Sequence, residues 1–406
     1  MKLAVVTYGT EGDTRPLAAL CRALMDAGHE ARLLADAATL GSANALGVPT
    51  TAMAGDIKGA LQPVVEQGGR FTGTASALAR IANVNAEAWL RQIVATAQDC
   101  DAIIVAGLAA FVGLSAAEYL GVKAIGAGMI PITPTAAFPS PFLPPRMVPR
   151  LLNRASHQFV NGLLWRAFRK TTNEARSVVC NLPARKNLWT EHPMLYGVSP
   201  SLLPTPHDWP VNARLCGQWS LPSQAWSPSQ SLGDFLASGE PPIYIGFGSM
   251  AGFDRPRMLK EIVNAIAGRR ALFQPGWSGV NTAELPENIF EIGETPHDWL
   301  FPRTSMVIHH GGSGTAHSAT RAGVPSVVVP FAGDQFFWAD RLRQAGVTAA
   351  AVSGKHPDAV KIADAIAFAK TETVRLRARA LGEKMHAEDG LVDAVSAIER
   401  IMSVEK

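Results

Sequence analysis

The sequence has few cysteines and little net charge, and each shortage excludes a class of protein. Its 406 residues include 4 cysteines, which lie far apart and show no paired spacing: Cys21, Cys100, Cys180 and Cys216. This distribution favours buried thiols in a reducing compartment over disulfides or a zinc site. The formal net charge of +3 is too small to indicate nucleic-acid binding.

The sequence also lacks any apolar run long enough to span a bilayer. Its first residues, Met1 to Thr7, turn polar too soon for a signal peptide. We therefore expect a cytoplasmic protein, with contact at a membrane surface left open. The length is sufficient for two domains, each with its own core.

Apolar strand patterns alternate with helical patterns along most of the chain. Leu3 to Thr7 predicts a buried parallel strand, Gly9 to Asp13 a loop, and Pro16 the start of a helix. This alternation predicts an α/β protein with parallel sheets and helices on both faces. Glycines that end a helix before an apolar strand recur at Gly28, Gly47, Gly121 and Gly323.

Residues 305–335 carry the most informative pattern in the chain. An apolar strand leads into the glycine-rich turn Gly311–Thr315, a helix-compatible segment follows, and a second strand ends in Asp334 and Gln335. Such a strand, turn and helix direct backbone N–H groups and the positive helix end at one point, which can bind phosphate. His310 adds a donor there, and the second strand ends where α/β sheets bind ligands. We therefore predict a phosphorylated ligand such as a nucleotide sugar.

Other interpretations of this turn are less favoured. A glycine-rich turn alone is weak evidence, but here it comes with a strand, a helix and a second strand end. Its glycine spacing does not match a nicotinamide site, and it lacks the lysine of a P-loop. A metal site of His309, His310 and His317 is disfavoured, because neighbouring residues on a strand point to opposite faces. For His309 we favour a buried ring bonded to backbone.

Two further patterns lie at predicted strand ends. A carboxylate at Asp13 would face the cleft between two sheets, where it can accept a proton from a bound hydroxyl. Capping of the helix that Pro16 opens is an equally good interpretation of Asp13. Gly246 to Ser249 ends the first strand of the second half, and the N–H groups of Gly248 and Ser249 are placed to approach a phosphate. The alternative is a glycine needed only for the turn.

The segment from Pro131 to Pro149 departs from the α/β pattern. It is rich in proline and contains Phe138 and Phe142, and an amphipathic basic stretch from Leu151 to Val179 follows. We interpret the two as an acceptor-binding loop, with Phe138 and Phe142 in an apolar pocket, and a helix that walls the pocket. A membrane-surface helix and an ordinary solvated basic face are the alternatives.

Three motifs of this chain together resemble those of a known family. They are Gly-Thr-Glu-Gly-Asp-Thr-Arg-Pro near the start, Thr-Pro-His-Asp-Trp-Leu-Phe-Pro at 295–302, and His-His-Gly-Gly-Ser-Gly-Thr with Pro-Phe-Ala-Gly-Asp-Gln downstream. The pattern resembles the UDP-glycosyltransferase superfamily, and within it the bacterial and fungal sterol and glycopeptide-antibiotic glycosyltransferases. The resemblance covers nearly the whole chain and implies the GT-B fold, in which two Rossmann-like doubly wound domains face a cleft.

The resemblance also implies a domain plan. Residues 1–205 would form the acceptor-binding domain and residues 229–385 the nucleotide-sugar-binding domain. The connection between them at 206–228 is rich in proline and serine. The last segment, 386–406, would be a helix that packs back on the first domain.

Residue roles follow from the resemblance by motif position. Asp13 would be the catalytic base, in a place where many members of the superfamily carry a histidine. Asp334 and Gln335 would bind the hydroxyls of the sugar. The residues implied to bind the diphosphate are His310, Gly312, Ser313, Gly314, Thr315 and Ser249.

The nucleobase contact departs from the plant members of the superfamily. They stack the base on a tryptophan, and this chain has Glu294 at that position. The remaining candidates are Thr295, His297 and Trp277.

The implied activity is metal-independent, inverting transfer of a sugar to a hydroxyl of a hydrophobic acceptor such as a sterol, polyketide, phenolic or lipid. The nucleotide sugar is a co-substrate and no other cofactor is implied. UDP-glucose is the default donor, with dTDP-deoxysugars as the alternative. A GT-B-fold epimerase and a non-catalytic nucleotide-sugar-binding protein are the alternative functions. The oligomeric state is not predicted.

Overall fold

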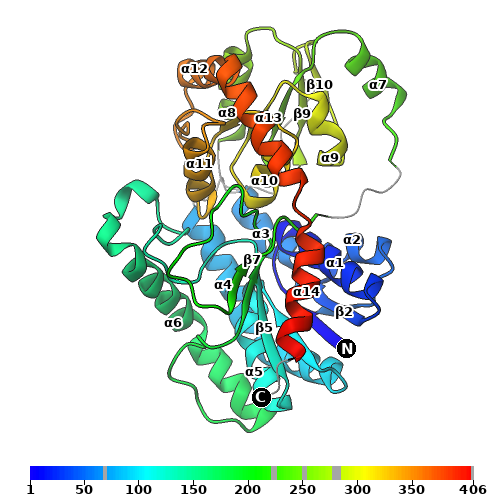
Figure 1. The fold of residues 1–406 in the computed structure, drawn as a ribbon, viewed down its shortest axis with the longest axis vertical. Coiled ribbons are helices and arrows are strands. Elements are labelled where there is room, and N and C mark those ends of the chain that lie inside the picture. Colours follow the sequence, from blue (N-terminus) through cyan, green and yellow to red (C-terminus); the bar gives the residue numbers. More distant parts are fainter. Residues whose placement is uncertain (67–70, 221–225, 249–253, 277–284, 404–406) are drawn as a thin grey trace.

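Two parallel sheets organise the chain, one in each lobe of Figure 1. Helices surround both sheets, which confirms the predicted α/β class. The computed structural model describes residues 1–66, 71–220, 226–248, 254–276 and 285–403.

The sheet of the first lobe has, among the described residues, seven parallel strands in the order β3-β2-β1-β4-β5-β6-β7. The chain winds outward from β1 in one direction and from β4 in the other, so the topological switch lies between these two strands. Ligands of open α/β sheets bind at the carboxyl ends of the strands beside such a switch. The strands are β1 (Lys2–Val6), β2 (Glu30–Asp36), β3 (Thr50–Met53), β4 (Ala102–Val105), β5 (Lys123–Gly128), β6 (Met194–Tyr196) and β7 (Ala213–Leu215).

The second lobe repeats this plan with a smaller sheet. Its described strands are parallel and follow the order β10-β9-β8-β11-β12, so the switch lies between β8 and β11. The strand predicted to lead into the turn at 311–315 is present as β11, and the strand predicted to end at 246–249 is present as β8. The strands are β8 (Ile243–Gly246), β9 (Ala271–Gln274), β10 (Ile289–Glu291), β11 (Met306–His309) and β12 (Ser326–Val328).

Helices cover both sheets (Figure 1). The four glycines predicted to end helices before strands all have positive φ angles, which glycine adopts without steric cost. In the first lobe the helices are α1 (Glu11–Asp26), α2 (Gly41–Ala45), α3 (Ile57–Glu66), α4 (Phe71–Ala97), α5 (Ala110–Leu120) and α6 (Asn153–Cys180). The remaining helices are α7 (Gln230–Ala237), α8 (Arg255–Ile266), α9 (His297–Leu300), α10 (Ser313–Arg321), α11 (Gln335–Gln344), α12 (Ala359–Ala369), α13 (Glu372–His386) and α14 (Gly390–Ser403).

The predicted loop at Gly9–Asp13 is wrong, because α1 begins at Glu11 rather than at Pro16. Thr10 is the N-cap, and the carboxylate of Asp13 reaches back to the N–H of Thr10 at 2.8 Å. This is the bond that the third residue of a helix makes in a capping box. The helix therefore starts earlier than the proline alone suggests.

Two short strands of the first sheet escaped prediction. Strands β6 and β7 have three residues each, too few to show a period in the sequence. Strand β7 lies inside the segment 206–228, so the first sheet extends into the predicted connection. The domain boundaries themselves stay predictions.

The last helix, α14, lies beside α1 in the first lobe (Figure 1). Ala394 and Ile398 belong to the same buried cluster as Leu17 and Leu20 of α1. The ammonium of Lys123 donates to the carbonyl of Ile401 at 2.9 Å. The end of the described chain thus completes the core around its beginning. The four cysteines are buried and unpaired.

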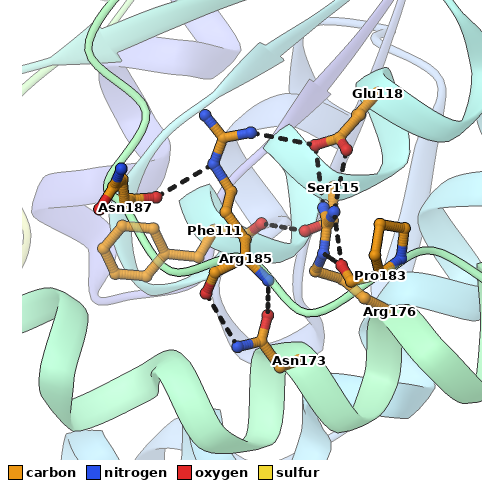
Figure 2. Close-up of polar contacts among 8 residues, drawn as sticks. All are labelled: Phe111, Ser115, Glu118, Asn173, Arg176, Pro183, Arg185 and Asn187. Atoms are coloured by element: carbon orange, nitrogen blue, oxygen red, sulfur yellow. Dashed lines mark hydrogen bonds and ion pairs between the residues drawn. The ribbon is translucent and has the colours of Figure 1, made fainter.

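The long helix α6 is held by a buried ion pair, drawn in Figure 2. Arg176, whose side chain is 2% exposed, donates to both carboxylate oxygens of Glu118 on α5 at 2.9 Å each. It also donates to the carbonyl of Pro183, and Arg185 lies 3.6 Å from Glu118. Bidentate pairs of this kind fix the relative orientation of the two side chains and also add stability. They tie α6 to α5 and to the chain that follows α6.

We expect Arg176→Met to lower the free energy of unfolding by about 3 kcal/mol, because Glu118 and the carbonyl of Pro183 lose their buried donor. The loss lies at the low end of the usual range because the Glu118 side chain is 33% exposed, so water can reach it. Urea unfolding followed by circular dichroism measures the change. Arg169→Met on the exposed face of the same helix is the control and should change stability by no more than about 0.5 kcal/mol. Equal effects of the two variants would show that the pair does not hold α6.

Candidate active site

The loops that follow β8 and β11 meet at the ring of His310. A β-carbon added to Gly248 would lie 3.2 Å from Cε1 of this ring, and one added to Gly312 would lie 2.4 Å from Nε2. The loop after β9 closes on the same place, since a β-carbon on Gly276 would lie 2.5 Å from the carbonyl oxygen of Gly248. The imidazole therefore fits between two glycines, and a side chain at Gly312 would force it to shift, whereas one at Gly248 would crowd it.

The His310 ring is neutral at physiological pH. Burial, assisted by the nearby His297, lowers the pKa of His310 to about 4. Its Nδ1 is buried and has no hydrogen-bond partner among the described residues. A buried polar atom without a partner is costly, and a bound ligand would relieve that cost. The orphaned nitrogen is consistent with the predicted ligand contact.

The turn after His310 exposes the amino end of α10. Gly311 has a φ of 91°, and a β-carbon there would lie 2.9 Å from Val328 and 3.0 Å from the carbonyl oxygen of Gln335. Gly312 is the N-cap of α10 and supplies no side-chain cap. The N–H groups of residues 313–315 therefore lack partners within the helix. They and the helix dipole form a site suited to an anion.

Ser313 has a second task that its motif position does not reveal. Its hydroxyl donates to the carbonyl of Met129 in the first lobe at 3.0 Å. Any contact of Ser313 with a diphosphate therefore falls to its backbone N–H. Gly314 is exposed with open space around its α-carbon, and Thr315 is partly exposed on the same turn.

Asp13 both caps α1 and presents a carboxylate to the junction between the lobes. Its Oδ2 accepts from the N–H of Thr10 at 2.8 Å and from the Thr10 hydroxyl at 3.3 Å. Its Oδ1 accepts no hydrogen bond from the described residues. A β-carbon on Gly9 would lie 2.3 Å from Oδ2, so the carboxylate occupies the space that this glycine leaves. Burial raises the pKa of Asp13 despite the Thr10 hydrogen bonds, which act to lower it.

The two interpretations of Asp13 are therefore compatible. The expectation that it is the N-cap residue is corrected, since Thr10 holds that place and Asp13 is the third residue of the helix. Thr10 was missed, although a threonine three residues before an acid is the recognised sequence signal.

Asp334 lies opposite, at the start of α11 in the second lobe. Its Oδ2 accepts from the indole Nε1 of Trp338 at 3.0 Å. Burial raises the pKa of Asp334 to about 6, and the negative charge of Asp13 raises it too. The effect of Asp13 is the smallest of the causes, and burial accounts for the direction of the shift in the pKa of Asp334.

Gln335 uses its amide oxygen to hold the loop before α11. The oxygen accepts from the N–H of Phe331 at 2.8 Å and from that of Ala332 at 3.2 Å. The side chain is buried at 6% exposure. Its contact with a sugar stays a prediction, and the structure assigns it a structural task that the sequence did not reveal.

The nucleobase candidates lie at the start of α9. His297 stacks on Phe301, with ring centroids 4.2 Å apart and planes 18° apart. Burial and the charge of Arg15 lower the pKa of His297 to about 4. Thr295 is buried and donates to the carbonyl of Gly293 at 3.2 Å. Two other predicted residues, Trp277 and Ser249, lie outside the described residues.

Arg15 of the first lobe reaches this region. Its guanidinium lies 3.3 Å from the carboxylate of Glu294, at the position where plant members of the superfamily carry tryptophan. No local pattern predicts this contact, because the two residues belong to different lobes. Exposed pairs of this kind add little stability. The contact places the Arg15 cation beside the predicted base site.

The predicted acceptor phenylalanines occupy different environments. Phe138 is 2% exposed and packs against Phe337 of the second lobe at a centroid distance of 5.2 Å. Its ring therefore fills the core between the lobes. Phe142 is 38% exposed at the surface. Their place in an acceptor pocket stays a prediction.

His317 uses both ring nitrogens, and one of them links the lobes. Its Nδ1 donates to the carbonyl of Ser313 at 2.8 Å, and its Nε2 accepts from the N–H of Ser199 at 3.2 Å. Burial lowers the pKa of His317 to about 4, which keeps the ring neutral and Nε2 able to accept. The Ser199 hydroxyl donates to Glu388 at 2.9 Å. This link was missed, since nothing in a sequence pairs residues from two lobes.

His309 has the environment predicted for it, because it is fully buried and its Nδ1 accepts from the N–H of Gly311 at 3.1 Å. Across the described residues, no three histidine, cysteine, aspartate or glutamate side chains gather to hold a metal ion.

Comparison with known proteins identifies the family. The family described as erythromycin biosynthesis protein CIII-like, C-terminal domain, matches residues 269–400. A sterol 3-beta-glucosyltransferase of Arabidopsis thaliana is 30% identical over 425 residues, which covers 100% of this chain and 69% of that protein. The chain belongs to the UDP-glycosyltransferase family. A sterol 3-beta-glucosyltransferase of Neurospora crassa is 31% identical over 98% of the chain, but the chain spans only 27% of that protein's length.

Solved structures agree on the GT-B fold of this family. The glycosyltransferase of kitacinnamycin superposes with a TM-score of 0.69 at 19% identity, covering 99% of both chains. The glycosyltransferase VinC, solved in complex with dTDP, gives the same TM-score at 17% identity and 99% coverage of both chains. At this level of identity the likeness establishes the fold alone.

We expect Asp334→Asn to raise the melting temperature at pH 8 and to lose that advantage at pH 4. The folded-state pKa of Asp334 is raised to about 6, so ionisation of this carboxyl costs stability above that pH. Below about pH 4 the carboxyl is protonated in both the folded and unfolded states, and the cost vanishes. The asparagine oxygen can still accept from Trp338.

Differential scanning fluorimetry across this pH range measures the effect. Asp358→Asn, at the exposed N-cap of α12, is the matched control and should show little change at either pH. A lower melting temperature of Asp334→Asn at pH 8 would contradict the cost assigned to ionising this carboxyl.

Proposed function

We propose that this chain is an inverting glycosyltransferase. It moves a sugar from a nucleoside diphosphate to a hydroxyl of a hydrophobic small molecule. One arrangement carries the proposal: α10 starts without a side-chain cap, and the hydroxyl of its Ser313 donates to Met129 of the first lobe, so this anion site lies against the lobe that holds Asp13. Asp13 would supply the base, and Asp334 the carboxylate that binds the sugar.

The second lobe would hold the donor. The free N–H groups at the start of α10 and the ring of His310 would receive the diphosphate. Negative charge gathers on the departing nucleoside diphosphate as the sugar is transferred. Donors already fixed in place stabilise this charge without reorganising, which is the usual large term in catalysis. The glycines around His310 support this role, because they leave the space that the ring occupies.

Asp13 would activate the acceptor. Its Oδ2 is held by Thr10, and Oδ1 remains to take the proton from the acceptor hydroxyl. The hydroxyl oxygen then bonds to the anomeric carbon while the bond from that carbon to the diphosphate oxygen breaks. A single displacement of this kind inverts the configuration. Burial of Asp13 raises its pKa toward neutrality and so strengthens it as a base.

The names of the relatives support the choice of substrates. Those quoted are called sterol 3-beta-glucosyltransferases, which favours glucose as the sugar and a sterol-like alcohol as the acceptor. UDP-glucose is therefore the proposed donor. The structural neighbour VinC was solved with dTDP, so dTDP-glucose belongs in the same assay. None of these relatives favours the alternatives of an epimerase or a non-catalytic binding protein.

Asp13→Asn should lower kcat roughly 10²–10⁴-fold, the usual contribution of a general base. The asparagine oxygen can still accept from Thr10, so the start of α1 and the binding of UDP should be preserved. Release of UDP from UDP-glucose in the presence of a sterol measures the first quantity, and calorimetry with UDP measures the second. Turnover near the wild-type rate would show that Asp13 is only a capping residue.

Chelation of divalent metals should leave the rate unchanged, because α10 and His310 are proposed to stabilise the leaving group. The same release assay with and without EDTA tests this expectation. A large loss of rate that Mg²⁺ restores would oppose the proposed role of these donors.

A further inference from the structure

The outer side of the first lobe carries a group of exposed apolar side chains. Leu151 is 98% exposed, Met147 76% and Phe159 61%. Leu152 and Leu163 are also exposed, at 52% and 45%. These five residues lie in the turns before α6 and on the first half of that helix, and we call them the α6 surface. Exposed large apolar groups that gather in one place mark interaction sites more often than scattered ones do.

The pattern of burial along α6 shows that the members of this surface on the helix share one face. Phe159 and Leu163 are four residues apart, so their side chains share a side, and Arg166 continues the same stripe. Val160 and Trp165 are buried against the lobe on the other side. Figure 1 shows α6 along the outside of the first lobe. The stripe therefore points away from the protein.

The charge around the surface has one sign. Residues 139–170 contain no aspartate or glutamate. They hold six cations: Arg146, Arg150, Arg154, Arg166, Arg169 and Lys170.

Few of these cations are neutralised. Arg154 pairs with Asp208 at 3.5 Å, and Lys170 lies 4.0 Å from Glu174. The other four have no hydrogen bond or ion pair within the described part of the chain. An ordinary solvated face mixes both signs, whereas this one combines free arginines with exposed leucine and phenylalanine.

We propose that the α6 surface docks on an anionic lipid membrane. Its apolar side chains would enter the boundary between head groups and acyl chains, and the arginines would contact lipid phosphates. No described helix is long and apolar enough to cross a bilayer, so the contact is one of docking. We favour a membrane over a folded protein partner. Single apolar side chains that project between arginines can insert into a fluid bilayer without a surface of complementary shape.

Hydrogen bonds to the preceding loop hold the first half of α6. The ring Nε2 of His157 lies 3.1 Å from the carbonyl of Phe138, and Asn161 donates to the carbonyl of Ile132 at 3.1 Å, so the exposed face keeps its orientation without a partner. The chain that bears Met147 and Leu151 also continues from Phe138, which packs between the lobes. Docking would therefore bring the junction between the lobes close to the bilayer. A hydrophobic acceptor dissolved in the bilayer would then lie close to the candidate site. This advantage rests on the proposed function, whereas docking itself does not.

Flotation with vesicles tests the proposal without any assay of activity. The wild-type protein should bind vesicles of phosphatidylcholine with phosphatidylserine, and bind pure phosphatidylcholine vesicles far less. The double variant Leu151→Asp with Phe159→Asp should lower the partition coefficient about tenfold or more. Arg150→Glu with Arg166→Glu should lower it about tenfold and reduce its dependence on salt. Absence of wild-type binding to the anionic vesicles would overturn the proposal.

Matched variants on the other lobe serve as controls. Val360→Asp on α12 and Arg379→Glu on α13 also change exposed residues, and they should leave vesicle binding intact. Equal losses in these controls would show that net charge or hydrophobicity, rather than the α6 surface, governs binding. If wild type is a dimer that Leu151→Asp with Phe159→Asp makes monomeric, and neither form binds vesicles, a second copy is the occupant and the proposal fails.

A water-soluble acceptor separates this proposal from the proposed function. Leu151 and Phe159 are exposed to solvent and do not line a pocket, contrary to a wall of the acceptor site at these two positions. Leu151→Asp with Phe159→Asp should therefore transfer sugar to such an acceptor at the wild-type rate and lose rate only with an acceptor held in vesicles. Loss of vesicle binding with intact transfer in solution supports both proposals. Intact vesicle binding by this variant would contradict the docking proposal and would not bear on the proposed glycosyltransferase activity.

Discussion

Burial at the junction between the two lobes sets the charge of the groups on which the candidate site depends. The same loss of water lowers the pKa of His310 and His317 and raises that of Asp13 and Asp334. The histidines are therefore neutral donors and acceptors, and the carboxylates are stronger bases than they would be in water. One physical cause therefore acts on candidate residues of both lobes together.

That contact is made by hydrogen bonds as well as by packing. His317 accepts from Ser199, and the hydroxyl of Ser313 donates to Met129 in the other lobe. Ser313 starts the helix whose N–H groups form the anion site. A shift between the lobes would therefore be felt at the diphosphate position directly. Residues that join the lobes and residues that would bind the donor lie on the same turn.

Much of the fold and part of the site followed from local patterns. The strands of the second lobe and the turn at 311–315 have strong periodicity and glycine signals, and they lie where predicted. The start of α1 was misplaced because Pro16 is a weaker signal than the bond between Thr10 and Asp13. Other features depend on residues distant in sequence, such as the burial of Phe138 against Phe337. No local pattern carries such information, which is why those features came only from the structure.

The position of α14 has a consequence for how the chain reaches its folded state. Its apolar face completes a core whose other members, such as Leu17 and Leu20, belong to the first helix. Contacts between such distant residues form slowly, because a long loop must close before they contribute. On a ribosome, the first lobe would emerge with the apolar side of α1 uncovered until the last helix is made. The two lobes are thus separate in shape but not separable as folding units, and a fragment cut between them would expose that surface to aggregation.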